Sequence, residues 1–370
     1  MKKIIIGILA VVLLCLMSLG FSDAMHSNAE GSHGEGLPKV DPKEIIFEHL
    51  GDAYGWELPF AHHRRIPLPI IVYGTDGFHV FSSSRVAHGE HYSDGSATFV
   101  IPAEGENKGK VVELVNGEEV KPYDISITKN VLAVFITLIL VIWCALSLVK
   151  WYKNNGNKAP KGFIGAFEAI MMFIYDGVIK STLKENARRF APYLLTVFFF
   201  IFMMNLLGLT VIFPGGANLT GNIAVTMTLA IMTFLVTNIF GTKHYWKDIF
   251  WPDVPMWLKF PLPIMPMIEL FGIFTKPAAL TIRLFANMMG GHMIVIVLTL
   301  LIFIFAGVGG YAVGGATAVV SVAFSIFMLL IDVLVSFIQA YVFTMLSTIF
   351  ISLAQENPHA EHGEHEQKND

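Results

Sequence analysis

Long apolar runs separated by short polar segments dominate the chain from about residue 131 onward. The runs lie near residues 131–149, 191–213 and 223–240, and two longer ones cover 264–306 and 316–354. A run of about 20 apolar residues spans a bilayer as a helix. A helix of about 40 residues is roughly 60 Å long, about twice the hydrocarbon thickness, so the last two must tilt or break. The pattern predicts an all-α polytopic membrane protein with about five transmembrane helices, the last two long and tilted as a hairpin.

Two further segments have the character of the membrane surface. Residues 162–180 are amphipathic and carry Glu168 and Asp176, which predicts an interfacial helix. Residues 249–263 combine two tryptophans with several prolines, so they are expected to lie at the membrane–water interface.

The N-terminal part has a different pattern. Residues 25–126 are polar, and 67–82 read as two short strands joined by a Gly-Thr-Asp-Gly turn, with further strands expected at 97–101 and 110–114. We expect a small, mostly β domain here. Its histidines match no strong metal-binding spacing, so a solvated loop is favoured over a metal site; these are His62, His63, His88 and His91.

The two ends and the basic residues set the expected topology. Residues 1–24 have two lysines, an apolar core and a small-x-small cleavage signature, which predicts a signal peptide; the alternative is a retained signal anchor. Lys and Arg flank the two expected cytoplasmic loops and are missing from 214–222 and 307–315. The positive-inside rule then predicts a bacterial inner-membrane protein with a periplasmic domain at 25–126, a membrane domain at 127–355 and a cytoplasmic tail at 356–370.

Composition excludes several other classes. The chain is 54% hydrophobic and 15% charged, with a mean hydropathy of +0.60, too apolar for an ordinary soluble domain. A net charge of −4 gives no indication of a nucleic-acid partner. Cys15 and Cys144 both lie in apolar runs and form no disulfide or metal framework. We find no nucleotide-binding loop, and we expect no cofactor.

Polar residues inside the last two apolar segments are few and costly. They are Glu269, Lys276, Arg283, Asn287, His292, Asp332, Ser336 and Gln339. Burying an arginine in a bilayer costs about 2.5–3.5 kcal/mol on insertion scales, and such residues mark ion or proton pathways by default. At 3.6 residues per turn, Asn287 shares a face with Arg283, while His292 lies on the opposite face. This arrangement indicates two polar paths with an arginine between them. For Arg283 alone, a buried ion pair within the chain is the alternative.

Several segments resemble a known family. KPAALTIRLFANMMGGHMIV is similar to the arginine helix of the a subunit of F-type ATP synthases, and FIQAYVFTMLSTIFISLA is similar to that subunit's last helix. NLLGLTVIF and NLTGNIAVTMTLA resemble its middle spans, so the likeness covers about 128–355. The domain at 25–126 departs from the short N-terminus of the family.

The resemblance implies a proton channel beside a ring of c subunits, each with one membrane-embedded carboxylate. Arg283 matches the essential arginine between two half-channels, and Asn287 and Gln339 match its polar neighbours. Glu269 matches a carboxylate of the cytoplasmic-side path. His292 and Asp332 match the acid–histidine pair of the periplasmic-side path, in the order His then acid, which resembles the mitochondrial arrangement. Ser336 shares a helix face with Asp332 and Gln339.

The resemblance also implies partners. These are the c-subunit ring, the b subunits of the peripheral stalk, the remaining F1Fo subunits and membrane lipid. The chain itself would not be catalytic. The alternative is a stand-alone secondary transporter or ion channel, and a third class is a non-transporting membrane scaffold. We find no internal repeat, which weighs against a transporter built from inverted repeats.

Overall fold

The computed structural model describes residues 51–355 apart from 58–64, 87–89, 96, 103–104, 106, 116, 157, 211–215, 217 and 251–263. Outside the described residues lie the predicted signal peptide, the polar tail, residues 251–263 of the interfacial stretch predicted at 249–263, and His62, His63 and His88. The chain forms two compact units. The first contains the described parts of Met1–Thr137, Leu207–Leu219 and Gly291–Asp332, and the second those of Leu138–Leu206, Thr220–Gly290 and Val333–Asp370.

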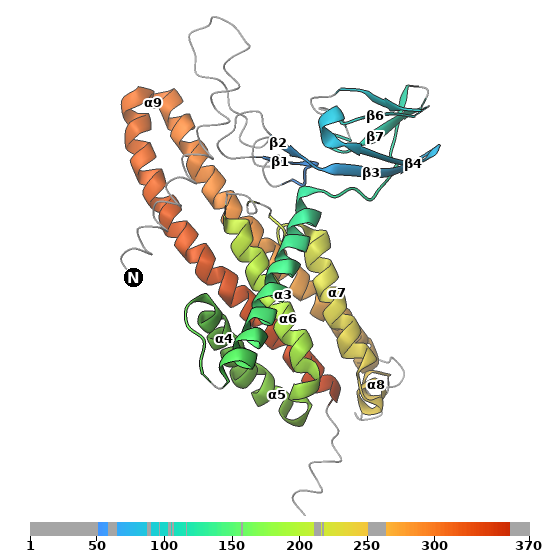
Figure 1. The fold of residues 1–370 in the computed structure, drawn as a ribbon, viewed down its shortest axis with the longest axis vertical. Coiled ribbons are helices and arrows are strands. Elements are labelled where there is room, and N and C mark those ends of the chain that lie inside the picture. The colour runs from blue at the N-terminus through green and yellow to red at the C-terminus, as the bar shows by residue number, and fades with distance from the viewer. Residues whose placement is uncertain are drawn as a thin grey trace, which may run out of the picture. The chain divides into compact units, whose positions relative to one another are not determined.

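The first unit includes a β domain of short antiparallel strands (Figure 1). They are β1 (Gly55–Glu57), β2 (Arg65–Pro67), β3 (Pro69–Gly74), β4 (Gly77–Ser82), β5 (Tyr92–Asp94), β6 (Ala97–Val100), β7 (Val112–Val115), β8 (Glu118–Val120) and β9 (Tyr123–Asp124). The sheets have the orders β1-β2, β4-β3-β9 and β5-β6-β7-β8. The β3–β4 hairpin forms at the Gly-Thr-Asp-Gly turn, and β6 pairs with β7, so the strands predicted at 67–82, 97–101 and 110–114 are confirmed.

Alternation along β3 and β4 places one face of their sheet in a core. Ile70 and Val72 are fully buried, and Phe81 packs with them and with Phe99 of β6. The hairpin turn is held by Glu113 of β7, whose buried carboxylate accepts hydrogen bonds from the backbone N–H and the hydroxyl of Thr75. A buried carboxylate is costly unless it is hydrogen-bonded, and these donors satisfy it.

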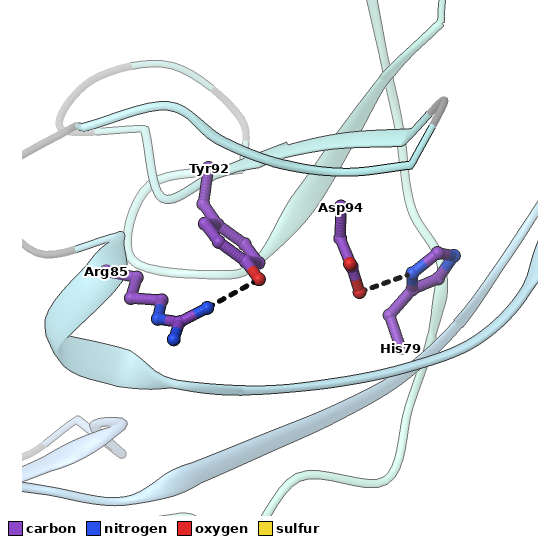
Figure 2. Close-up of polar contacts among 4 residues, drawn as sticks. All are labelled: His79, Arg85, Tyr92 and Asp94. Carbon is purple, nitrogen blue, oxygen red and sulfur yellow. Dashed lines mark hydrogen bonds and ion pairs between the residues drawn. The ribbon is translucent and has the colours of Figure 1, made fainter.

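Two polar pairs border this core (Figure 2). His79 of β4 lies with Nδ1 3.0 Å from Oδ2 of Asp94. Arg85 of the 3-10 turn η1 (Ser83–Arg85) donates from an Nη atom to the hydroxyl of Tyr92 at 2.6 Å. Both pairs join the β4–η1 segment to strand β5, so they tie the two larger sheets together at one side of the domain.

The β domain continues into the first long helix without a free linker. The N–H groups of Ile125 and Ile127 donate to the carbonyls of Ile71 and Pro69, at 2.9 and 3.2 Å. Helix α3 (Lys129–Asn155) then begins, and the Lys129 N–H donates to the Ala53 carbonyl at 2.9 Å. The last of these bonds satisfies a donor at the start of the helix that has no partner within it.

The remaining elements are helical. They are α4 (Phe163–Ile174), the π-helical turn η3 (Tyr175–Lys180), α5 (Ser181–Leu183), the 3-10 turn η4 (Lys184–Asn186), α6 (Ala187–Leu209), α7 (Ile223–Ile239), α8 (Lys243–Phe250) and α9 (Ile264–Gln355). Within the described part of the chain, four helical stretches are long and apolar enough to cross a membrane: Lys129–Asn155, Phe163–Leu209, Leu270–Val308 and Val313–Gln355. Helix α7 is a shorter apolar helix. The predicted class, a mostly helical polytopic membrane protein, is confirmed.

The predicted interfacial helix and the following span are separate helices. Lys184 has a φ of 48°, a left-handed backbone conformation that a right-handed helix does not contain, so the chain turns between α5 and α6. Helix α6 ends at Leu209, earlier than the predicted end at Phe213. The second unit packs α3, α4, α6 and α9 around one apolar core, in which Phe167 stacks on Phe199 at 4.1 Å.

Helix α9 consists of two long arms joined at Gly310 (Figure 1). Gly310 has φ 76° and ψ −178°, a backbone conformation open mainly to glycine, and the chain reverses there. Near the turn the arms come so close that a side chain at Gly314 would begin 2.6 Å from the Cβ atom of Ala306. The hairpin predicted for the last two apolar segments is therefore present.

Candidate functional site

Arg283 lies on an exposed face of the first arm of α9. The neighbouring Ile282 is 61% exposed, whereas Leu280 and Leu284 are buried in the core of the second unit. Across the residues that the structure describes, Arg283 forms no ion pair and no hydrogen bond. A charged guanidinium on a surface of apolar side chains is costly to leave uncompensated in a membrane.

One turn further along, the two arms meet through a polar contact. Asn287 donates from Nδ2 to Oε1 of Gln339 at 3.2 Å. Gln339 is only 6% exposed, and its Nε2 has no hydrogen-bond partner within the described ranges. Ser336 is buried one turn earlier on the same arm. The structure thus brings together Asn287 and Gln339, two of the residues predicted to surround Arg283.

His292 and Asp332 belong to the first unit. Asp332 lies directly against Gly291, the residue before His292: a Cβ atom at Gly291 would be 2.8 Å from Asp332 Oδ1. The Nε2 atom of His292 is buried and has no hydrogen-bond partner in the described part of the chain. The two predicted residues therefore come from facing arms at neighbouring positions, and only glycine leaves room for the carboxylate.

The last predicted residue, Glu269, is part of α9, but its side chain lies outside the described residues. Two turns further along, Lys276 lies over the ring of Phe350, with Nζ 5.3 Å from the ring centre. A small cavity opens beside this lysine between α7, α8 and α9, and its polar lining comes from Thr233, Thr237, Asn238, Tyr245 and Lys276.

Sequence reasoning missed one buried polar pair. The hydroxyl of Thr220 donates to Oδ1 of Asn205 at 2.7 Å, and both residues are almost completely buried. The sequence did contain a signal for this pair. Asn205 is an amide in the apolar run of α6, and a polar side chain buried in such a segment needs a hydrogen-bond partner.

Costly polar groups on facing arms of a long hairpin, within a polytopic helical chain, define a membrane protein of the ion-transporting class. The profile of the family described as ATP synthase A chain matches residues 131–352. The chain therefore belongs to this family. It is a proton-translocating membrane component of an F-type ATP synthase.

Similarity to individual proteins supports the same family. The chain is 43% identical over 251 residues to ATP synthase subunit a of Chlorobium phaeobacteroides, covering 66% of this chain and 69% of the relative. It is 44% identical over 246 residues to ATP synthase subunit a 2 of Chlorobaculum tepidum, covering 64% of this chain and 65% of the relative. Strain BS1 of C. phaeobacteroides has a subunit a that is 36% identical over 346 residues, covering 90% of this chain and 82% of the relative.

The N-terminal domain also has relatives. Residues 45–130 match a domain of unknown function, DUF8433. The alignment with the BS1 protein is too long to be confined to the membrane domain, so it extends into this region as well. The β domain is thus shared by other proteins, but the match carries no activity.

Proposed function

We propose that this chain forms two proton half-channels that open onto a ring of c subunits, with Arg283 between them. The observation that carries this proposal is the exposed guanidinium of Arg283, which has no charge partner among the described residues. A counter-charge supplied by another subunit removes the cost of leaving it alone in the membrane.

A passing ring carboxylate has the required chemistry. At a separation of about 4 Å and an effective dielectric constant of about 20, attraction between unit charges is about 4 kcal/mol. Beside Arg283 the carboxylate is therefore favoured in its ionised form and gives up its proton. Facing lipid, it is favoured in its neutral form. Arginine stays charged throughout, so Arg283 enforces proton exchange and also blocks direct passage of protons between the two paths.

The neighbouring amides support this role. The Nε2 atom of Gln339 is buried and has no partner in the part of the chain that is described, and Asn287 holds the same amide through its oxygen. A donor fixed in this way is available to an incoming carboxylate. We assign Asn287, Gln339 and Ser336 to the proton-exchange region on this basis.

The periplasmic-side path is assigned to His292 and Asp332. Imidazole accepts and donates protons near neutral pH, and a carboxylate close by accepts them in turn. The contact of Asp332 with Gly291 supports the pairing, because it brings the carboxylate to the residue beside His292. The cytoplasmic-side path is assigned to Glu269, which belongs to the same arm of α9 as Arg283.

The remaining assignments follow from the same proposal. The chain crosses a bacterial inner membrane five times, with the β domain in the periplasm and the C-terminus in the cytoplasm; the distribution of Lys and Arg supports this topology. It is not catalytic by itself. Its partners are the c-subunit ring, the b subunits of the peripheral stalk, the remaining F1Fo subunits and lipid.

Replacement of Arg283 tests the proposal. In inverted membrane vesicles, Arg283→Ala is expected to abolish ATP-driven proton pumping while the complex still assembles. Arg283→Lys is expected to restore little, since a lysine has a different shape and a less persistent charge. Ile282→Ala is the matched control, because it truncates an exposed neighbour without removing charge, and it should pump normally. Normal pumping by Arg283→Ala would exclude the assigned role.

A further inference from the structure

The sheet β4-β3-β9 has a second face that is apolar and exposed. Its side chains form what we call the outer-sheet patch: Tyr73, Phe78, Val80, Tyr123 and Ile125, which are 47, 67, 64, 78 and 63% exposed. The strand register makes them neighbours, because Tyr73 is opposite both Phe78 and Tyr123. The rings of Tyr73 and Phe78 meet edge to face at 5.1 Å.

Such a face is unusual for a sheet surrounded by water. Antiparallel sheets with one buried face normally carry polar residues on the other. Contiguous exposed apolar patches mark interaction sites. The patch also contains two tyrosines, and tyrosine is enriched where one end of a side chain meets lipid and the other meets water.

The patch is fixed close to a membrane helix. Ile125 is four residues before Lys129, so their Cα atoms are at most about 14 Å apart. Nor is this segment a flexible tether, because Ile127 is bonded to the Pro69 carbonyl and the first turn of α3 is bonded to Ala53 and Asp52.

The patch lies on the face of the sheet that is opposite the domain core, and the chain leads from it into α3. Figure 1 shows β3 and β4 between the first turns of α3 and the strands β6 and β7. β6 packs on the inner face of the β3–β4 sheet, so the patch lies on the face that is turned away from β6. Val131 and Phe135, in the first two turns of α3, are exposed apolar residues as well. Both the sheet and the start of the membrane helix therefore carry exposed apolar side chains.

We propose that the outer-sheet patch rests on the membrane, among the lipid headgroups and the upper part of the acyl chains. A lipid surface fits the aromatic composition, the short bonded junction and the exposed apolar residues at the start of α3. The inference needs only that α3 spans the membrane and is independent of the proton path.

Lipid contact can be measured in the assembled complex reconstituted into vesicles. A fluorescent label on Phe78→Cys should be quenched several-fold more strongly by lipids with a nitroxide headgroup than the same label on Glu118→Cys. Glu118 is an exposed residue of β8 in the other large sheet. The unmodified complex gives the labelling background. Tyr123→Cys, on a neighbouring strand, should behave like Phe78→Cys and keeps the test open if one variant assembles poorly.

A soluble quencher separates the competing explanations. Strong quenching of the Phe78→Cys label by iodide, equal to that at Glu118→Cys, would mean that the patch faces water and would overturn the proposal. Protection from both iodide and the nitroxide lipid would mean that a protein surface covers it, either a second copy or another subunit, and would overturn it equally.

Discussion

Gly291 gives a sharp test of the periplasmic-side assignment. A methyl group at this position would lie 2.8 Å from Oδ1 of Asp332 and 3.1 Å from both Cγ and Oδ2. Ordinary contacts begin at 3.4 Å, so Gly291→Ala requires the carboxylate to retreat by 3.4 − 2.8 = 0.6 Å. The variant moves the proposed proton-relay carboxylate without removing it.

The adjacent glycine supplies the control. A methyl group at Gly290 would have no atom within 4 Å. Both substitutions raise helix propensity by the same roughly 1 kcal/mol, so this effect cancels between them. Overpacking at Gly291 costs about 1–3 kcal/mol. If all of it falls on the proton-transfer step, flux decreases roughly 5- to 150-fold.

The assay is ATP-driven proton pumping in inverted vesicles, measured with a pH-sensitive dye and normalised to assembled complex on native gels. Gly290→Ala should pump like the parent, and Gly291→Ala should pump clearly more slowly. Equal rates in the two variants would refute the reasoning, because they would show that the position of Asp332 does not limit proton transfer.

Two further predictions concern the β domain and the membrane core. Burial and a hydrogen bond to Asp124 raise the pKa of the Tyr54 hydroxyl in the folded domain. The neutral hydroxyl therefore contributes its full stability below about pH 10, and this contribution is lost as the pH rises through the raised pKa of the folded state. Proteolysis of the β domain should therefore accelerate at alkaline pH less in Tyr54→Phe than in the parent; identical pH profiles would contradict this. Thr220→Val leaves the buried carbonyl of Asn205 without its donor and should destabilise the membrane domain by about 1–3 kcal/mol, seen as a lower dissociation temperature of the solubilised complex. Thr228→Val, at an exposed hydroxyl bonded within its own helix, should leave that temperature almost unchanged.

The sequence predicted the helices and strands better than it predicted the contacts between them. The short runs of β3 and β4 on either side of the Gly-Thr-Asp-Gly turn and the apolar runs of α3, α6 and α7 are local signals, so the sequence alone predicted these elements. The end of α6 could not, because the residues after Leu209 are as apolar as those before it. Nor did the pattern predict that one apolar face of β3 and β4 would be exposed.

In the candidate site, too, local geometry could be predicted from the sequence and contacts between distant segments could not. The face shared by Arg283 and Asn287 follows from helix geometry, but the contact between Asn287 and Gln339 depends on the register of two arms about fifty residues apart. That register is set at Gly310, in a glycine-rich link where the sequence allows several turning points. The roles of the site residues in proton transfer stay predictions until the variants are measured.

The bonded junction between the β domain and α3 also constrains the order of events during synthesis. The backbone at Ile125 and Ile127 closes one edge of the β4-β3-β9 sheet, and Lys129 and Asn130 bond to residues at the start of the domain. The domain consequently cannot complete its hydrogen bonding until the beginning of α3 has been made. Folding of the β domain is therefore coupled in time to synthesis of the first membrane helix, and a chain that ends before Tyr123 leaves the edge of β3 open.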